Sequence, residues 1–116
     1  MSNGDCLFCK IAKGELPADV VLDRDGVIAF RDINPQAPTH VLLIPKEHIE
    51  SLDAIRDDHG PLLADIVQAA AHLAHTEGVD ESGWRLVSNV GPDAGQAVFH
   101  LHFHLLGGRP MGWPPG

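Results

Sequence analysis

Residues 99–105 read Phe-His-Leu-His-Phe-His-Leu, with histidines at positions 100, 102 and 104. Successive side chains of a strand point to opposite faces, so this alternation predicts three imidazoles on one face, spaced by about 6.6 Å. The intervening phenylalanines and leucines then enter the core. A helix would place His102 opposite the other two histidines and would scatter the apolar side chains around its axis. We therefore predict a strand over residues 98–106.

The remaining sequence predicts four more strands and two helices. The strands are expected at residues 20–22, 27–30, 39–44 and 84–90, the first two joined around Asp25-Gly26. A short helix is expected over residues 5–14 with Asp5 as its N-cap, and a long helix over residues 60–78. The apolar stripe of the long helix consists of Leu62, Leu63, Ile66, Val67, Ala70, Leu73 and Ala74. This order predicts an α+β fold, in which the long helix packs on a five-stranded, mostly antiparallel sheet.

The length and the net charge of the chain limit the number of domains and the kinds of partner that we expect. At 116 residues, the chain fits a single domain over residues 1–116. Its net charge of −8, from 8 basic and 16 acidic residues, disfavours nonspecific binding to nucleic acid or to anionic membranes. No apolar run reaches the ~18 residues that span a bilayer, and the chain opens with polar Ser2-Asn3-Gly4-Asp5, so we expect a cytoplasmic protein. The unusual feature is histidine, with 8 residues.

The histidine strand has three interpretations: a solvated sheet face, a catalytic metal site, or nucleophilic catalysis by imidazole. Catalytic metal sites often add a carboxylate, but no Asp or Glu follows Asp93, which argues against that option. In the third interpretation, a neutral imidazole nitrogen attacks phosphorus and forms a phosphohistidine that water then hydrolyses. The turn at residues 91–96, just before the strand, is of a kind that aims backbone N–H groups at an anion.

The two cysteines lie in the sequence Cys6-Leu7-Phe8-Cys9. This spacing is half of a zinc site, but a single pair is also compatible with a redox pair or with two unrelated helix cysteines. In a chain expected to be cytoplasmic, a structural disulfide is disfavoured.

Several motifs together resemble the histidine triad family. Its signature, three alternating histidines followed by two apolar residues, matches His100-Leu101-His102-Phe103-His104-Leu105-Leu106. The further matching segments are residues 32–40, 44–48, 95–96 and 107–109. The tail Trp113-Pro114-Pro115-Gly116 is similar to the Hint branch of the family, the purine nucleoside phosphoramidate hydrolases. The resemblance implies hydrolysis of purine nucleoside phosphoramidates or adenylylated amines, with release of the nucleoside monophosphate.

The resemblance implies a role for each matching histidine. His102 would be the nucleophile that takes the nucleotidyl group, and His104 would contact the α-phosphate and assist the leaving group. His40 would complete the proton-handling set. The family's transferase branch has glutamine at the third triad position, so His104 favours hydrolysis. The nucleotide would contact an apolar slot for the base (Leu7, Phe8, Ile11, Phe30, Ile33), a carboxylate for the ribose (Asp32) and phosphate donors (Asn89, Gly95, Gln96, Ala97).

The resemblance also implies a metal and a second chain. In zinc-containing members, two histidines complete the cysteine pair, and they correspond here to His48 and His100. The result would be a closed structural zinc site at Cys6, Cys9 and these two histidines, with no catalytic metal. The Hint branch further implies a homodimer with a continuous sheet, in which Trp113 approaches the partner's active site.

Position 97 departs from the Hint branch, where serine is common. The hydroxyl of that serine reaches the phosphate or the leaving group, so Ala97 bears on leaving-group preference and rate. It keeps open an alternative function, a nucleotide-binding interaction protein with weak or vestigial hydrolase activity. Three histidines, His59, His72 and His75, match no motif.

Overall fold

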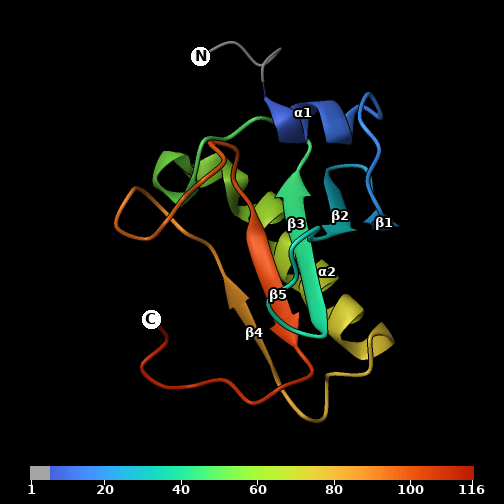
Figure 1. Ribbon diagram of the computed structural model, residues 1–116. Helices are drawn as coiled ribbons and strands as arrows, with labels where there is room; N and C mark the ends of the chain where they lie inside the picture. The colour runs from blue at the N-terminus through green and yellow to red at the C-terminus, as the bar shows by residue number, and fades with distance from the viewer. Residues whose placement is uncertain (1–5) are drawn as a thin grey trace.

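The computed structural model describes residues 6–116, which form a five-stranded antiparallel sheet with one long helix against it (Figure 1). The strands lie in the order β1-β2-β3-β5-β4 across the sheet. Their bounds are Val20–Asp23 (β1), Val27–Arg31 (β2), Thr39–Pro45 (β3), Trp84–Val87 (β4) and Phe103–Gly107 (β5). The helices are α1 (Leu7–Ala12) and α2 (Gly60–Thr76), with 3-10 turns at Leu52–Ala54 (η2) and Asp57–His59 (η3). The predicted fold class is confirmed.

Helix α2 packs its apolar stripe on one face of the sheet. Its buried residues are Ile66, Ala69, Ala70, Leu73 and Ala74. The predicted stripe was wrong at Val67, which is 50% exposed, and Ala69 is buried in its place. The reason is helical geometry, since residue 69 lies one turn from residues 66 and 73, whereas residue 67 is rotated by about 100° from residue 66. Among the residues described, no helix is long and apolar enough to span a bilayer.

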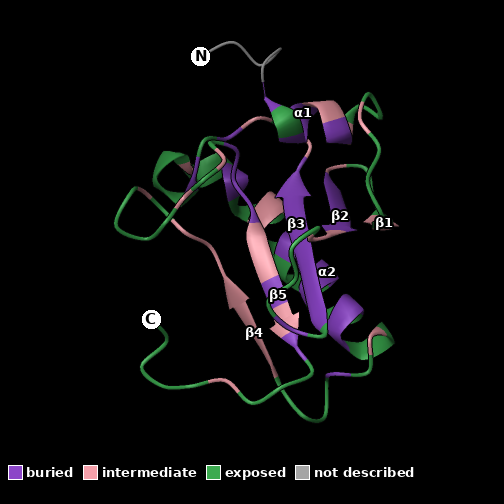
Figure 2. Cartoon of the chain, viewed as in Figure 1, coloured by how far each residue is buried: buried purple, intermediate pink, exposed green. Residues whose placement is uncertain are grey.

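The opposite face of the sheet carries a second apolar cluster. It joins α1 to the two strands beneath it and consists of Cys6, Phe8, Cys9, Ile11, Ile28, Phe30, Leu42 and Ile44. Strands β2 and β3 are therefore buried on both faces, which explains why they read as continuous apolar runs (Figure 2). Because side chains alternate along a strand, His40 of β3 shares the α1 face with Leu42.

The histidine segment is only partly a strand. Because β5 begins at residue 103, His100 and His102 precede it, and the predicted strand over residues 98–106 was too long. The amide of Leu101 donates to the carbonyl of Ile49 at 2.6 Å instead of to a neighbouring strand. The neighbour of β5 is short as well, since β4 ends at Val87 and not at residue 90 as predicted.

Two further predictions concern the burial of Phe99 and the N-cap of α1. Phe99, expected in the core, is 52% exposed, because the chain at this position has left the sheet. The predicted N-cap, Asp5, lies outside the described residues. Within them, Cys6 caps α1, and its Sγ accepts the amide of Cys9 at 3.3 Å.

Candidate functional site

Two of the predicted catalytic histidines meet across neighbouring strands. In the antiparallel register of β3 and β5, Leu42 lies opposite His104, and His40 is two positions away on the same face. This register brings Nε2 of His40 to 2.9 Å from Nδ1 of His104. His40 is buried and His104 is half-buried, so the contact is largely shielded from water.

Hydrogen bonds around this pair determine where its protons lie. The backbone amide of Gln36 donates to Nδ1 of His40 at 3.0 Å, so neutral His40 carries its proton on Nε2. That proton is donated to Nδ1 of His104, which leaves His104 with its own proton on Nε2. A carboxylate oxygen of Asp32 lies 3.4 Å from the same Nε2 of His40. His104 therefore presents an N–H donor on the side away from His40.

In His102 the proton lies on Nδ1, whereas in His40 and His104 it lies on Nε2. Nδ1 of His102 donates to the backbone carbonyl of His100 at 2.8 Å, because a carbonyl only accepts, so in the neutral ring the lone pair lies on Nε2. The carbonyl of His102 accepts the hydroxyl of Ser88 at 2.8 Å. The ring lies edge-on to Phe8, with centroids 5.2 Å apart, and 5.1 Å from the ring of His104. A basic nitrogen and an N–H donor thus belong to adjacent rings.

Burial keeps two of these imidazoles neutral. Burial, together with the rings of His102 and His40, lowers the pKa of His104 to about 4. Burial also lowers the pKa of His40, although the Asp32 carboxylate acts in the opposite direction. Both rings are therefore uncharged at neutral pH, in agreement with their hydrogen bonds.

A pocket of about 490 Å³ lies beside α1 and β2, within the size range of small-molecule sites. Six of the residues predicted to contact the nucleotide line it: Leu7, Phe8, Ile11, Phe30, Asp32 and Ile33. The sequence motifs did not predict the other residues that line the pocket: Pro17, Ala18, Asp19, Arg31 and Leu42. Leu42 could have been found, because it lies two positions after His40 on a strand and shares its face. Residues 17–19 form a loop without periodicity. Asp32 joins the pocket to the histidines.

The segment expected to bind phosphate is a closed turn. The amides of Gly95 and Gln96 donate to the carbonyls of Pro92 and Gly91, at 3.1 and 3.0 Å. The side chain of Gln96 also accepts the amide of Gly91 and donates to the carbonyl of Glu50. Gln96 therefore ties this turn to the loop after β3, and its own amide and that of Gly95 already have acceptors.

The other predicted nucleotide contacts lie outside the pocket lining. Ala97 is exposed just after the closed turn, and Asn89 is half-buried next to Ser88, which binds the backbone of His102. Trp113 is 83% exposed within the chain.

The three unassigned histidines differ from one another. His59 is buried, and its Nδ1 accepts the amide of Arg56 at 3.0 Å while its Nε2 lies 3.3 Å from the Glu47 carboxylate. His72 and His75 are exposed on α2. His59 therefore stabilises the loop after β3, which carries His48.

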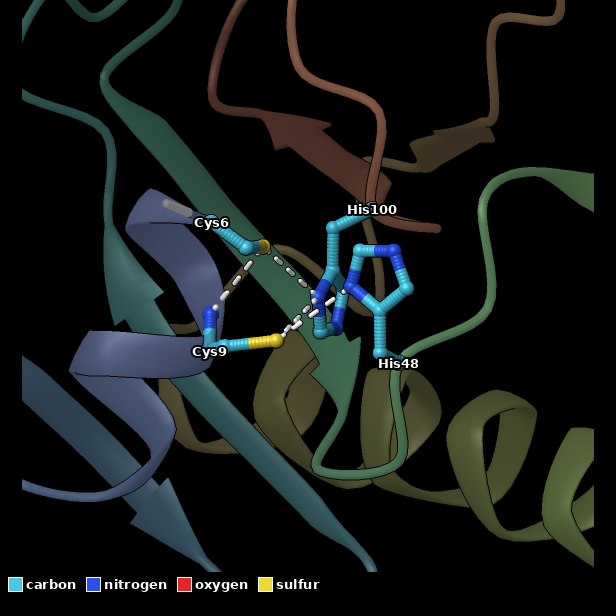
Figure 3. Close-up of side chains that lie close together, drawn as sticks. All are labelled: Cys6, Cys9, His48 and His100. Atoms are coloured by element: carbon cyan, nitrogen blue, oxygen red, sulfur yellow. Dashed lines mark hydrogen bonds between the residues drawn. The ribbon is translucent and has the colours of Figure 1, made fainter. Parts of the chain in front are cut away.

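The residues of the predicted metal site, Cys6, Cys9, His48 and His100, converge in space (Figure 3). Nδ1 of His100 lies 3.3 Å from Sγ of Cys6 and 3.5 Å from Sγ of Cys9, and Nδ1 of His48 lies 3.2 Å from Sγ of Cys9. Zinc–sulfur bonds of about 2.3 Å and zinc–nitrogen bonds of about 2.0–2.1 Å put such atoms about 3.6 Å apart in a tetrahedron. Nε2 of His100 donates to the carbonyl of Pro45 at 2.8 Å, which leaves Nδ1 as the ligand atom. The cluster could hold a tetrahedral metal ion.

The sequence matches the family model described as the HIT domain over residues 13–111. The chain belongs to the HIT domain family. It is 48% identical over 112 residues to an uncharacterised HIT-like protein of Synechococcus elongatus, with 97% of each chain covered. It is 45% identical over 108 residues to the purine nucleoside phosphoramidase of Escherichia coli, with 93% of this chain and 91% of that protein covered.

Solved structures of HIT proteins share the fold. A HIT family hydrolase from Legionella pneumophila superposes with a TM-score of 0.95 at 57% identity, covering 97% of this chain and all of that chain. A HIT family hydrolase from Clostridium thermocellum gives a TM-score of 0.92 at 50% identity, covering 96% of each chain. The resemblance to the histidine triad family is confirmed.

Proposed function

We propose that this protein hydrolyses purine nucleoside phosphoramidates or adenylylated amines and releases the nucleoside monophosphate. The observation that carries the proposal is the hydrogen bond from Nδ1 of His102 to the carbonyl of His100, which leaves a lone pair on Nε2 beside the ring of His104. A nucleophile next to a proton-carrying group is what transfer of a phosphoryl group to a side chain requires. Similarity to HIT family hydrolases and to a purine nucleoside phosphoramidase supports the same reaction.

The reaction would have two steps. In the first, Nε2 of His102 bonds to phosphorus while the phosphorus–nitrogen bond of the substrate breaks. The amine leaves with the bonding electron pair and takes one proton from the His40–His104 pair. In the second step, water attacks phosphorus, the bond to His102 breaks, and the pair takes up the proton that water loses.

The proton would arrive with the substrate. In the free site the pKa of His104 is about 4, so the pair is neutral at neutral pH. A phosphoryl anion beside an imidazole favours the charged form, so binding of the substrate raises the affinity of the pair for a proton. Since the two rings share a hydrogen bond, the proton belongs to the pair and not to either ring alone.

The nucleoside would bind in the pocket described above. Its apolar wall of Leu7, Phe8, Ile11, Phe30 and Ile33 suits a purine base. Asp32 would accept the ribose hydroxyls, and Asn89 with the backbone amide of Ala97 would contact the phosphate. In the turn before Ala97 the amides of residues 95 and 96 already have acceptors, so Ala97 is the remaining amide donor we propose.

We further propose that Cys6, Cys9, His48 and His100 hold a structural zinc ion. When bound, zinc would supply folding free energy by tying α1 to the loop after β3 and to the segment before β5. We also propose that the chain is one HIT domain over residues 1–116 and forms a homodimer in which Trp113 approaches the partner's site. Analytical ultracentrifugation tests the dimer.

The activity is tested by hydrolysis of adenosine phosphoramidate. We expect turnover by the wild type and loss of at least about a thousandfold in His102→Ala, since the nucleophile is removed. His72→Ala is the matched control, because His72 is exposed on α2, and it should retain the wild-type rate. Equal rates for wild type and His102→Ala would contradict the proposal. Nucleotide binding with negligible turnover across several leaving groups would favour the interaction protein instead.

A further inference from the structure

The two carboxylate oxygens of Asp32 make different contacts. Asp32 directly follows β2, and its amide donates to the carbonyl of His40 at 3.0 Å. Its Oδ1 accepts the amide of Asn34 at 2.8 Å, which fixes the side chain in the turn. Its Oδ2 lies 3.4 Å from Nε2 of His40, and the side chain is only 18% exposed. An anion is therefore held against a buried imidazole.

His40 has one proton and two acceptors for it. Since the amide of Gln36 occupies Nδ1, the proton lies on Nε2, 2.9 Å from Nδ1 of His104 and 3.4 Å from Oδ2 of Asp32. Within residues 6–116, the carboxylate of Asp32 is the only one that lies within 4.0 Å of a ring nitrogen of His40 or His104. The remaining titratable group that faces the pair is His102, on the segment before β5. Asp32 is thus the negative charge available to balance a proton on the pair.

We propose that Asp32 is a positioning residue for the His40–His104 pair, in addition to its contact with the nucleoside. This inference rests on the proposed function, in which the pair carries a proton to the leaving amine. A carboxylate next to an imidazole orients the ring and stabilises its protonated form. Because Asp32 also lines the pocket, a ribose hydroxyl that binds it reaches the same carboxylate, so nucleoside recognition and proton transfer share one side chain.

The charge balance supports the same assignment. Burial lowers the pKa of both His40 and His104, and the carboxylate of Asp32 acts against burial at each ring. Removing this charge without changing the size of the side chain should leave the rings in place and make the pair harder to protonate.

The test compares the wild type with Asp32→Asn on adenosine phosphoramidate and on the analogue that lacks both ribose hydroxyls. We expect kcat to fall roughly tenfold on both substrates. We also expect the alkaline decline of kcat to begin at lower pH in the variant, because a weaker acid site loses its proton sooner as the pH rises. Equal kcat values for the two proteins on the analogue, with a loss confined to KM for the ribose substrate, would overturn the proposal and leave Asp32 as a ribose contact.

Asp19→Asn is the matched control. Asp19 also lines the pocket, but its carboxylate lies 3.6 Å from the guanidinium of Arg31. Its substitution should leave the alkaline decline of kcat at the wild-type pH.

A second readout needs no substrate. Nitrogen NMR of the His40 and His104 rings in the free protein should show protonation at lower pH in Asp32→Asn than in the wild type. This result would support the proposal even if the wild type hydrolysed neither substrate, an outcome that would refute the proposed function alone. Unchanged ring titration in Asp32→Asn would overturn the proposal.

Discussion

The backbone carbonyl of His100 accepts the Nδ1 proton of His102 at 2.8 Å, while Nδ1 of the His100 ring lies 3.3 Å from Sγ of Cys6. One residue therefore connects the candidate metal site to the candidate nucleophile. Helix α1 connects them a second time, because Phe8 lies between the two cysteines, lines the pocket beside α1 and β2, and packs edge-on against His102. The candidate metal site and the proposed nucleotide site are therefore built on the same short segments.

Removal of the proposed zinc ion should weaken nucleotide binding. Helix α1 has only six residues, too few to be stable without its packing and its ligands. We expect chelated protein, and the Cys9→Ser variant, to bind adenosine monophosphate roughly tenfold more weakly and to unfold at lower temperature. Calorimetric titration, with metal content and circular dichroism measured on the same samples, checks this. An unchanged Kd for adenosine monophosphate in metal-free, folded protein would show that nucleotide binding does not depend on the metal.

Nucleotide binding should take up protons. The pKa of His104 is about 4 in the free site, and a bound phosphate anion raises it. Since the bound state holds more protons, the affinity for adenosine monophosphate should rise as pH falls from about 8 to about 6. Calorimetric titrations in two buffers with different ionisation enthalpies measure the uptake. His104→Gln should abolish most of this uptake, and a wild-type affinity that is independent of pH would show that nucleotide binding does not protonate the His40–His104 pair.

The ion pair between Arg31 and Glu77 should stabilise the fold in a pH-dependent way. Two contacts, at 2.7 and 3.0 Å, join β2 to the end of α2, and the hydrogen bond from Arg31 lowers the pKa of Glu77. Such a carboxyl stabilises the folded state above its unfolded pKa, and this stabilisation is lost as the pH falls through its folded pKa. The Arg31 side chain is 40% exposed, so solvent screening limits the contribution of the pair.

We therefore expect Glu77→Gln to lower the free energy of unfolding by about 1 kcal/mol at neutral pH and by much less near pH ~3. Urea unfolding at both pH values checks this. The same deficit at both would show that the charge of Glu77 is not the cause.

Phe8 and Phe99 form a matched pair of substitutions. Phe8 is 5% exposed and Phe99 is 52% exposed, although the strand pattern predicted Phe99 in the core. Phe8→Ala should lower the free energy of unfolding by about 3 kcal/mol and weaken nucleotide binding. Phe99→Ala should change it by less than about 0.5 kcal/mol. Denaturant unfolding of both variants measures the difference, and similar losses would contradict the placement of Phe8.

The alternating histidines predict a strand correctly only from Phe103 onward. The pairing of β5 ends at Val87 of β4 and at Leu43 of β3, although β3 itself continues to Pro45, and the histidine run encodes neither limit. The amide of Leu101 instead binds the carbonyl of Ile49, far away in the sequence. The alternation of histidines and apolar residues therefore predicted that a strand is present, but not the residue at which it begins.

The candidate site was also predicted only in part, because sequence motifs identify its residues but its contacts depend on strands that are far apart in the sequence. The motifs named His40 and His104 as members of one site, but their 2.9 Å contact depends on the register between β3 and β5. The contact of Asp32 with His40 depends on the loop that joins two strands. The pocket residues in the loop at 17–19 were missed because loop residues carry no repeating pattern. The motifs therefore predicted that His40 and His104 belong to one site, whereas the pairing of the strands determines which of their atoms are in contact.

The proposed reaction begins with the attack of Nε2 of His102 on phosphorus. Rapid mixing of the wild type with adenosine phosphoramidate, followed by an alkaline quench and mass spectrometry of the digested protein, would detect the covalent intermediate. We expect an adenylyl group on His102 that forms within the first turnover and disappears as adenosine monophosphate is released, with the same adduct in His72→Ala and none in His102→Ala. Release of adenosine monophosphate by the wild type with no adduct on His102 at any time point would show that His102 is not the nucleophile.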